Sequence, residues 1–290
     1  MLTALIKTMR PRQWVTKNIF IFAALVADKQ LFKPEAFLRT LAGFALFSLI
    51  SSCVYIINDL ADVEADRQHP EKKNRPIASG KLPVGVAITA AILFVIITFV
   101  LAYLLTPSLL AVIGGYFVIN LAYSKWLKHV PILDVLIISA GFVLRVGAGV
   151  TLIDVERFSP WLYVVMTLLS LFLGFGKRRA ELALLAHGAG SHRKVLDGYT
   201  LPLLDQYIMI VSGATIVAYS LYTFSAPNLP ENHSMMLTIP FVVYAIFRYM
   251  YLIEVKHAGG APEEVLLSDR PFQLAMVLWG LTVLAIFYLS

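Results

Sequence analysis

Eight apolar stretches, each long enough to cross a lipid bilayer, dominate this sequence of 290 residues. The hydrocarbon core of a bilayer is ~30 Å thick and a helix rises ~1.5 Å per residue, so about 20 apolar residues suffice. The chain is 59% hydrophobic and 14% charged, which excludes an ordinary soluble domain. We therefore predict an all-α, polytopic membrane protein. The stretches lie at roughly 37–57, 84–105, 108–125, 132–151, 160–176, 203–224, 236–254 and 271–289.

A ninth and weaker apolar stretch covers 14–27. It is short and contains Lys17 and Asn18, so it crosses the membrane only if these two side chains face a polar cavity. We count it, which predicts about nine transmembrane helices around such a cavity. Residues 1–12 combine an apolar helical face with three cations, as a helix in the membrane interface would.

The distribution of lysine and arginine predicts the orientation of the chain. With the N-terminus inside, eighteen of these residues fall on the cytoplasmic side, counting Lys17 near the start of the ninth stretch, and four on the other side. Cytoplasmic loops carry such an excess of positive charge. We therefore predict one transmembrane domain over 1–290, with cytoplasmic loops at about 58–83 and 177–202 and a polar cavity that faces the cytoplasm.

An acidic segment follows the second span, where Asn58 and Asp59 begin the sequence NDLADVEAD. If the helix continues through it, Asp59, Asp62 and Asp66 share one face at i, i+3 and i+7. Like charges at this spacing repel, so a divalent cation would compensate them, and ligands that are all oxygen indicate Mg²⁺. The alternative is a solvated acidic loop, which is costly so close to a bilayer.

The spacing NDxxDxxxD at a membrane edge resembles the first aspartate motif of the UbiA superfamily of intramembrane prenyltransferases. Further segments resemble one branch of it, the decaprenyl-phosphate phosphoribosyltransferases, and the likeness covers nearly the whole chain. These segments are RPRQW from Arg10, RPIASG from Arg75, Tyr123-Ser124 with Leu127-Lys128, and GFGKRRAE from Gly174 to Glu181.

The resemblance implies transfer of a 5-phosphoribosyl group from phosphoribosyl pyrophosphate to a polyprenyl phosphate such as decaprenyl phosphate, releasing diphosphate. Such a lipid serves the synthesis of cell-envelope arabinan and other polysaccharides. It implies a multi-pass protein of the cell (inner) membrane whose active site faces the cytoplasm. The implied catalytic and Mg²⁺-binding residues are Asp59, Asp62 and Asp66, with Asn58 and Arg75 beside them at the substrate.

A basic segment stands where most superfamily members have a second aspartate cluster. It contains Lys177, Arg178 and Arg179, followed by Glu181. Each additional phosphate on a donor requires cations, and these residues would form a cradle for the 5-phosphate. The alternative is that they only mark the cytoplasmic end of a helix and contact lipid phosphate.

Other polar residues are candidate substrate ligands. Arg145 shares a helical face with Asp134 in the fifth span; it either holds an anionic headgroup or pairs with another helix. Lys17, Arg145 or Lys128 could align the acceptor phosphate, and Tyr123, near Lys128 in the sequence, is a further candidate substrate ligand. The branch reads Gln-Trp-x-Lys-Asn near its start, whereas this chain has one more residue before Lys17. Such an insertion turns a helical face by about 100°.

Two other functions stay open on the sequence. One is prenyl transfer from a prenyl diphosphate to an aromatic or glycerol-phosphate acceptor, which the missing second aspartate cluster disfavours. The other is a membrane transporter or lipid-binding protein without enzymatic activity. The histidine spacing does not fit a zinc site, and the basic residues sit at helix ends rather than in a nucleic-acid interface. Some relatives are oligomers, so a homo-oligomer stays open.

Overall fold

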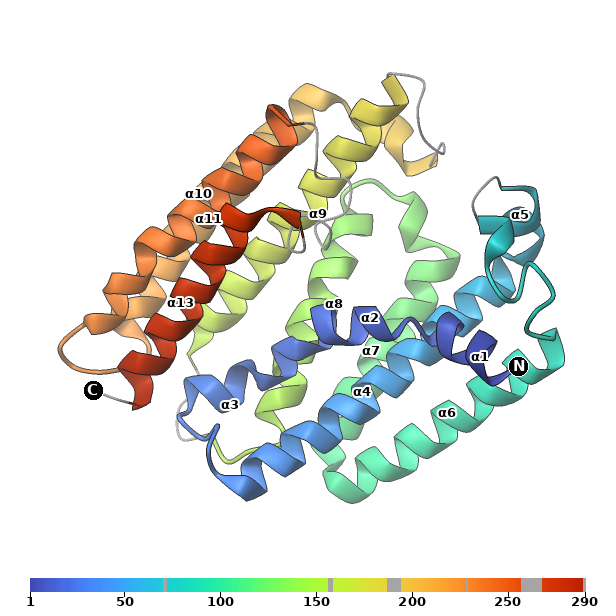
Figure 1. Cartoon of the computed structure of the whole chain (residues 1–290), viewed down its shortest axis with the longest axis horizontal. Helices are drawn as coiled ribbons and strands as arrows, with labels where there is room; N and C mark the ends of the chain where they lie inside the picture. The colour runs from blue at the N-terminus through green and yellow to red at the C-terminus, as the bar shows by residue number, and fades with distance from the viewer. Residues whose placement is uncertain (70–71, 156–158, 187–193, 228, 257–267, 289–290) are drawn as a thin grey trace. The chain divides into compact units, whose positions relative to one another are not determined.

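The computed structural model describes residues 1–69, 72–155, 159–186, 194–227, 229–256 and 268–288. Within these ranges the chain is helical and contains no strand (Figure 1). The prediction of an all-α fold is therefore confirmed.

Eight helical segments are long and apolar enough to cross a membrane, at positions close to the eight predicted stretches. They are rich in leucine, isoleucine, valine and alanine and contain few charged residues, as expected for segments in lipid. A helix suits this environment because all of its backbone hydrogen bonds are made within the segment. The helices are α4 (Pro34–Ala61), α6 (Val84–Leu105), α7 (Pro107–Lys125), α8 (Leu133–Val150), α9 (Pro160–Ala186), α10 (Leu201–Ser225), α11 (Ile239–Glu254, preceded by η6, Ser234–Thr238) and α13 (Arg270–Tyr288).

The ninth predicted span, 14–27, is a series of short helical turns instead of one regular helix. It follows α1 (Leu2–Met9) and α2 (Pro11–Gln13). The turns are of three kinds: a π-helix η1 (Trp14–Asn18), a 3-10 helix η2 (Ile19–Phe22) and the short α3 (Ala23–Ala27).

The helix α9 extends further than predicted. It covers residues of the expected loop at 177–202 up to Ala186, so Lys177 to Glu181 are helical. The reason is local, because arginine, lysine, glutamate and alanine favour helix, and Arg178 pairs with Glu181 at i, i+3. The expected loop at 58–83 likewise contains the end of α4, the helix α5 (Val63–Gln68) and the 3-10 turn η3 (Lys72–Asn74).

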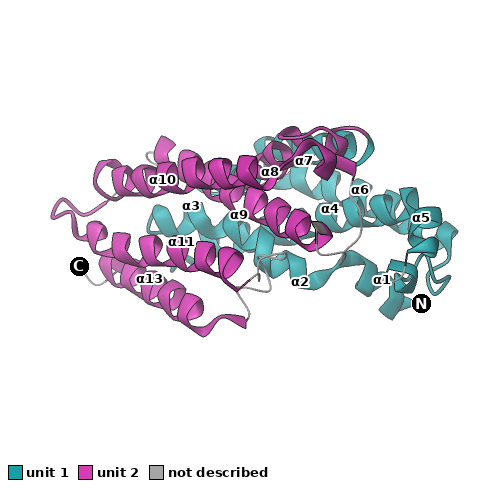
Figure 2. Cartoon of the chain, turned by 90° about the horizontal axis from the view of Figure 1, so that it is seen from above, with its two compact units in different colours: residues 1–125, 144–155 teal, residues 126–143, 156–290 magenta. Residues whose placement is uncertain are grey.

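The chain divides into two compact units, coloured separately in Figure 2. Unit 1 contains residues 1–125 and 144–155, and unit 2 contains residues 126–143 and 156–290. Each unit has its own apolar core.

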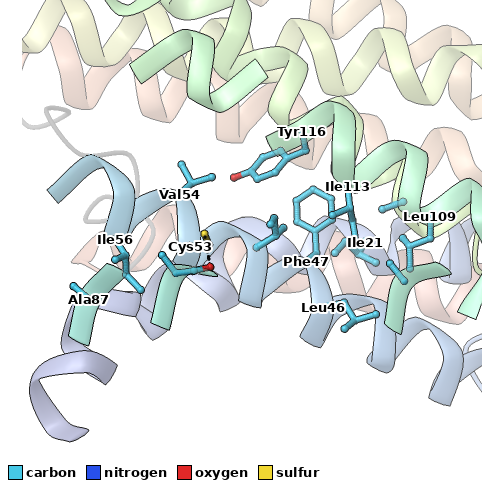
Figure 3. Close-up of a cluster of buried hydrophobic side chains, with 14 of the residues drawn as sticks. Ile21, Leu46, Phe47, Cys53, Val54, Ile56, Ala87, Leu109, Ile113 and Tyr116 are labelled. Carbon is cyan, nitrogen blue, oxygen red and sulfur yellow. Dashed lines mark hydrogen bonds between the residues drawn. The ribbon is translucent and has the colours of Figure 1, made fainter. Parts of the chain in front are cut away.

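The core of unit 1 is built around α4, against which α1, α6 and α7 pack. Figure 3 shows its centre, where the rings of Phe47 and Tyr116 lie 4.6 Å apart between their centroids. The Cys53 thiol donates to the carbonyl of Ala91 on α6. Close packing of this kind fixes the rotation of α4, and with it the direction of the polar residues at its C-terminal end.

The core of unit 2 joins α9, α10 and α11, with α13 packed on α11. Phe172 and Tyr249 meet edge to face, with ring centroids 5.3 Å apart. A Cβ on Gly174 would lie 2.5 Å from Val135, so α8 approaches α9 too closely there for a larger residue. This contact fixes the part of α9 that immediately precedes the basic segment.

Candidate active site

The acidic segment is split by a break in the helix. The helix α4 ends at Ala61, Asp62 takes a non-helical conformation, and α5 starts at Val63. The three aspartates therefore do not share one continuous helical face, contrary to the conditional prediction. The break turns α5 so that Asp59 and Asp66, both 3% exposed, point to one common partner.

That partner is Arg75, which follows η3 in the loop after the acidic segment. Its Nη1 donates to Asp59 Oδ1 at 3.1 Å and to Asp66 Oδ2 at 2.7 Å. One guanidinium nitrogen thus lies between two buried carboxylates. The arrangement compensates charges that would otherwise be very costly to bury.

A second arginine reaches the same site from the N-terminus. Arg10 Nη2 donates to Asp59 Oδ1 at 2.7 Å, and its guanidinium carbon lies 4.8 Å from the centroid of the Tyr55 ring. Arg10 forms the corner between α1 and α2 with φ 56° and ψ 59°, the left-handed region that a non-glycine residue rarely adopts. Pro11 disfavours a right-handed helix at Arg10 and so ends α1 there.

The corner is held on α4 by hydrogen bonds to Ser52. Its hydroxyl donates to the carbonyl of Met9 and accepts from Trp14 Nε1 at 3.0 Å. These contacts lie on both sides of Arg10 in the sequence, so they fix where its side chain emerges.

The carboxylates fit a Mg²⁺ ion that brings phosphate ligands of its own. Asp59 Oδ2 and Asp66 Oδ1 receive none of the arginine hydrogen bonds, so each carboxylate keeps one oxygen for a cation. Within the described ranges, no three His, Cys, Asp or Glu side chains form a metal site by themselves. Mg²⁺ commonly takes one or two carboxylates and fills its other positions with water and substrate phosphate.

The other predicted residues of the acidic segment lie around this pair. Asn58 is half-buried in the last turn of α4, and its carbonyl accepts from the amide of Asp62. Asp62 is half-buried at the helix break, where its carbonyl accepts from the amide of Asp66. Glu64 points outward and pairs with Arg67, and both side chains are exposed. The buried site therefore uses only part of the acidic segment.

A second polar cluster of unit 1 surrounds Arg145 inside the membrane-spanning part. Arg145 Nε donates to Asn18 Oδ1 at 2.8 Å and its Nη2 to the Tyr116 hydroxyl at 3.1 Å. The guanidinium also lies over the rings of Tyr116 and Phe47. Asn18 Nδ2 in turn donates to Ser48 on α4. Arg145 thus joins three helical segments, which agrees with the structural alternative stated above and leaves the headgroup role a prediction.

The π-helix Trp14–Asn18 explains how the additional residue is accommodated. A π turn holds one residue more than an α turn, so an insertion can be absorbed within it without rotating the helix beyond it. Asn18 consequently faces α4 and Arg145. A Cβ on Gly149 would lie 2.0 Å from the carbonyl oxygen of Ile21, so only glycine permits this close approach of α8. Lys17, which precedes Asn18 in the chain, donates to Gln13 and is half-buried.

Tyr123 and Lys128 lie in different units. Tyr123 is half-buried in the last turns of α7 in unit 1, whereas Lys128 is half-buried in the 3-10 turn η4 (Leu127–His129) of unit 2. Their substrate roles stay predictions.

The basic segment on α9 is neutralised by carboxylates within unit 2. Arg178 is 1% exposed; its Nε donates to Asp134 Oδ2 at 2.6 Å and its Nη1 to Glu181 Oε2 at 2.8 Å. The Tyr199 hydroxyl donates to the other oxygen of Asp134 and accepts from the backbone amide of Ile132. Burial and the negative charge of Asp134 raise the pKa of Tyr199, which keeps this hydroxyl protonated.

The neighbouring arginine is also paired. Arg179 donates to Asp205 on α10 and, through Nη2 at 2.7 Å, to Glu254 at the end of α11. Both carboxylates are much more exposed than Arg179. Lys177 is half-buried on the same helix. Arg178 and Arg179 therefore connect helices of unit 2, which is the structural role that the sequence left open beside the phosphate cradle.

Two participants were not predicted from the sequence. Arg10 is 49 residues from Asp59, and the only local signal is that it ends the N-terminal helix α1 immediately before a proline. Tyr199 is 65 residues from Asp134, and no pattern in the sequence connects the two. Both contacts depend on how the helices pack.

Comparison with known proteins agrees with this architecture. A profile of the UbiA prenyltransferase family matches residues 19–263. The chain is 36% identical over 303 residues to the decaprenyl-phosphate phosphoribosyltransferase of Mycolicibacterium smegmatis, covering 100% of this chain and 94% of that protein. It is 35% identical over 292 residues to the protein of the same name from Corynebacterium glutamicum, covering 98% of this chain and 87% of that protein.

The fold is also found in solved structures. A UbiA homologue from Archaeoglobus fulgidus bound to GPP and Mg²⁺ superimposes with a TM-score of 0.74, covering 98% of this chain and 99% of that chain at 16% identity. The apolar helices, the acidic pair on α4 and α5 and the profile match lead to one conclusion: this multi-pass membrane protein belongs to the UbiA prenyltransferase family.

Proposed function

We propose that this protein transfers the 5-phosphoribosyl group of phosphoribosyl pyrophosphate to a polyprenyl phosphate, such as decaprenyl phosphate, and releases diphosphate. The observation that carries the proposal is similarity over nearly the whole chain to phosphoribosyltransferases of that lipid. The buried pair Asp59 and Asp66, bridged by Arg75, supports it because it can bind the diphosphate end of a donor.

The donor diphosphate would bind at the acidic pair together with Mg²⁺. Asp59 and Asp66 would hold the ion through their remaining oxygens, with Asp62 and Asn58 at its edge. When bound, Mg²⁺ stabilises the negative charge that grows on the leaving diphosphate. Arg75 would exchange carboxylate oxygens for phosphate oxygens, which it binds by charge-assisted hydrogen bonds.

Arg10 has a different part in this exchange. Its position is fixed by the corner between α1 and α2, so it would stay on Asp59 when Arg75 turns to the donor. The carboxylate would then keep both its orientation and its negative charge.

The acceptor needs alignment more than activation. A polyprenyl phosphate is already an anion, so its oxygen can attack the anomeric carbon without a general base. Holding the two reactants in line can supply a large part of the rate enhancement. Lys17, Tyr123, Lys128 and Lys177 are each proposed contacts to substrate phosphates, and Arg145 fixes Asn18, the neighbour of Lys17.

The excess of lysine and arginine in the predicted cytoplasmic loops supports a site that faces the cytoplasm in the cell (inner) membrane. We propose that the two compact units belong to one transmembrane domain. A homo-oligomer is compatible with this arrangement.

The proposal predicts a sharp difference among the acidic residues. Asp59→Asn and Asp66→Asn each remove a carboxylate from the buried site, and we expect kcat to fall about 100-fold or more, as it does when an electrostatic contact to a transition state is lost. Glu64→Gln is the matched control, because this exposed residue pairs only with the exposed Arg67. Phosphoribosyl transfer is measured with purified protein in liposomes, with and without EDTA. Near-parental rates in both aspartate variants, or full activity in EDTA, would contradict the proposed site.

A further inference from the structure

The donor named above carries a phosphate at each end, and the acidic pair accounts for only one of them. The second phosphate needs a cation that the fold has not already neutralised. We propose that Lys72, beside Arg75, binds this 5-phosphate and so distinguishes the donor from a prenyl diphosphate. The inference rests on the proposed function and names the residue that recognises the second phosphate.

The arginines of α9 are poorly suited to this task. Arg178 is buried against Asp134 and Glu181, and Arg179 is bound by Asp205 and Glu254. Two guanidinium groups thus face four carboxylates. A donor phosphate would have to displace these carboxylates and would meet their negative charge. Unit 1 is therefore better suited to hold the second phosphate.

The loop after the acidic segment contains two lysines whose ammonium groups are available to a ligand. Neither Lys72 nor Lys73 donates its ammonium group to an acceptor among the described residues. Their backbone amides are bound to His69 instead. The amide of Lys72 donates to His69 Nδ1 at 3.3 Å, and the amide of Lys73 donates to the His69 carbonyl at 3.2 Å. The turn is thus held in place while the lysine side chains remain available to a ligand.

The geometry of η3 selects Lys72 over Lys73. The amide of Arg75 donates to the carbonyl of Lys72 at 2.9 Å, which closes a 3-10 turn. Side chains at i and i+3 of such a turn eclipse one another, about 6 Å apart along its axis. From this spacing we infer that Lys72 emerges on the same side as Arg75, the residue after η3, whose guanidinium lies between Asp59 and Asp66. Consistent with this, Lys72 is half-buried and Lys73 is exposed.

This arrangement matches the chemistry of a donor with two phosphate groups. Arg75 lies where the diphosphate would bind, and Lys72 lies one turn away, where a phosphate on the far side of a sugar ring could reach it. A lysine ammonium is a suitable point charge for a phosphate that needs attraction more than a fixed bidentate geometry. A prenyl diphosphate has no second phosphate group at its other end that could contact Lys72.

The test compares two ligands that differ in the 5-phosphate. Binding of phosphoribosyl pyrophosphate and of inorganic pyrophosphate, each with Mg²⁺, is measured on the purified full-length protein by calorimetry. We expect Lys72→Ala to weaken phosphoribosyl pyrophosphate roughly 10- to 100-fold, as loss of a hydrogen bond to a charged group would. Pyrophosphate affinity should stay at the parental value. Lys72→Arg should retain most of the affinity, and Lys73→Ala, the matched control, should behave as the parent with both ligands.

Two results would overturn the assignment while leaving the proposed function intact. If Lys72→Ala weakens both ligands equally, Lys72 contacts the diphosphate or supports the fold; if it weakens neither, another residue holds the 5-phosphate. A parent that binds pyrophosphate but gains no affinity from the phosphoribosyl part would instead reject the proposed function, and this assignment with it.

Discussion

Buried charge in this protein is compensated by arginines that each serve more than one partner. Arg75 lies between Asp59 and Asp66, and Arg178 lies between Asp134 and Glu181. The two arginines differ in exposure, since Arg75 is 29% exposed and Arg178 is 1% exposed. A partly exposed arginine can release a carboxylate and bind a ligand, whereas a fully buried arginine stays paired and stabilises the fold.

Arg178 should therefore affect stability before it affects substrate. Arg178→Gln leaves Asp134 buried without its charge partner, which typically costs about 3–5 kcal/mol. We expect a clearly lower melting temperature in detergent. The double variant Asp134→Asn/Arg178→Gln should be more stable than Arg178→Gln, because no uncompensated charge remains. Arg179→Gln is the control, since its carboxylate partners are largely exposed and such pairs contribute at most about 1 kcal/mol.

The opposite result would support the predicted phosphate cradle instead. If Arg178→Gln melts like the parent but raises the KM for phosphoribosyl pyrophosphate, Arg178 is a donor ligand and its pairing with Asp134 gives way to substrate.

At the same scale, the sequence predicted the chemistry of the site better than its contacts. Asp59, Asp66 and Arg75 lie within one segment, so their type and spacing could be interpreted locally. The pairing of Arg10 with Asp59 joins residues far apart in the chain and depends on the corner at Pro11. The basic segment was also predicted to be a phosphate cradle, because nothing in the sequence shows that Asp205 and Glu254 lie next to Arg179.

Among the elements, the π-helix η1 is the one that departs most from regular geometry. It lies between α2 and η2, where the chain has one residue more than the branch pattern near Lys17. The hydrogen bonds of Asn18 to Ser48 and Arg145 hold the end of the π turn against α4 and α8. The sequence alone predicted a rotation of about 100° here, because periodicity assumes a regular α-helix.

We predict that one residue can be deleted from the segment 14–27 without loss of fold. Removing the exposed Val15 should convert the π turn to an α turn and leave Asn18 against Arg145. We expect a melting temperature and a donor affinity close to those of the parent. Deleting Leu49 from the regular helix α4 is the control. This deletion should rotate Ser52 and Asp59 by about 100°, and so abolish both the folded state and donor binding. If the two deletions are equally harmful, the π turn itself is required.

The described part of the molecule is a set of apolar helices whose buried ion pairs form a few clusters. Its spans could be predicted because their length and apolarity are set by the thickness of the membrane. The end of α9 was predicted too early, because a charged segment that pairs within its own unit continues as helix. The orientation stays a prediction that rests on the distribution of lysine and arginine.

The central claim is that the site at the end of α4 transfers a phosphoribosyl group. The most direct measurement supplies the purified protein in liposomes with a short polyprenyl phosphate and either phosphoribosyl pyrophosphate or a prenyl diphosphate, and identifies the lipid product by mass spectrometry. We predict a lipid that gains one ribose phosphate, with release of diphosphate, only from the first donor and only with divalent metal and an intact Asp59. Transfer of a prenyl group from the second donor, with phosphoribosyl pyrophosphate left unconsumed, would contradict the account.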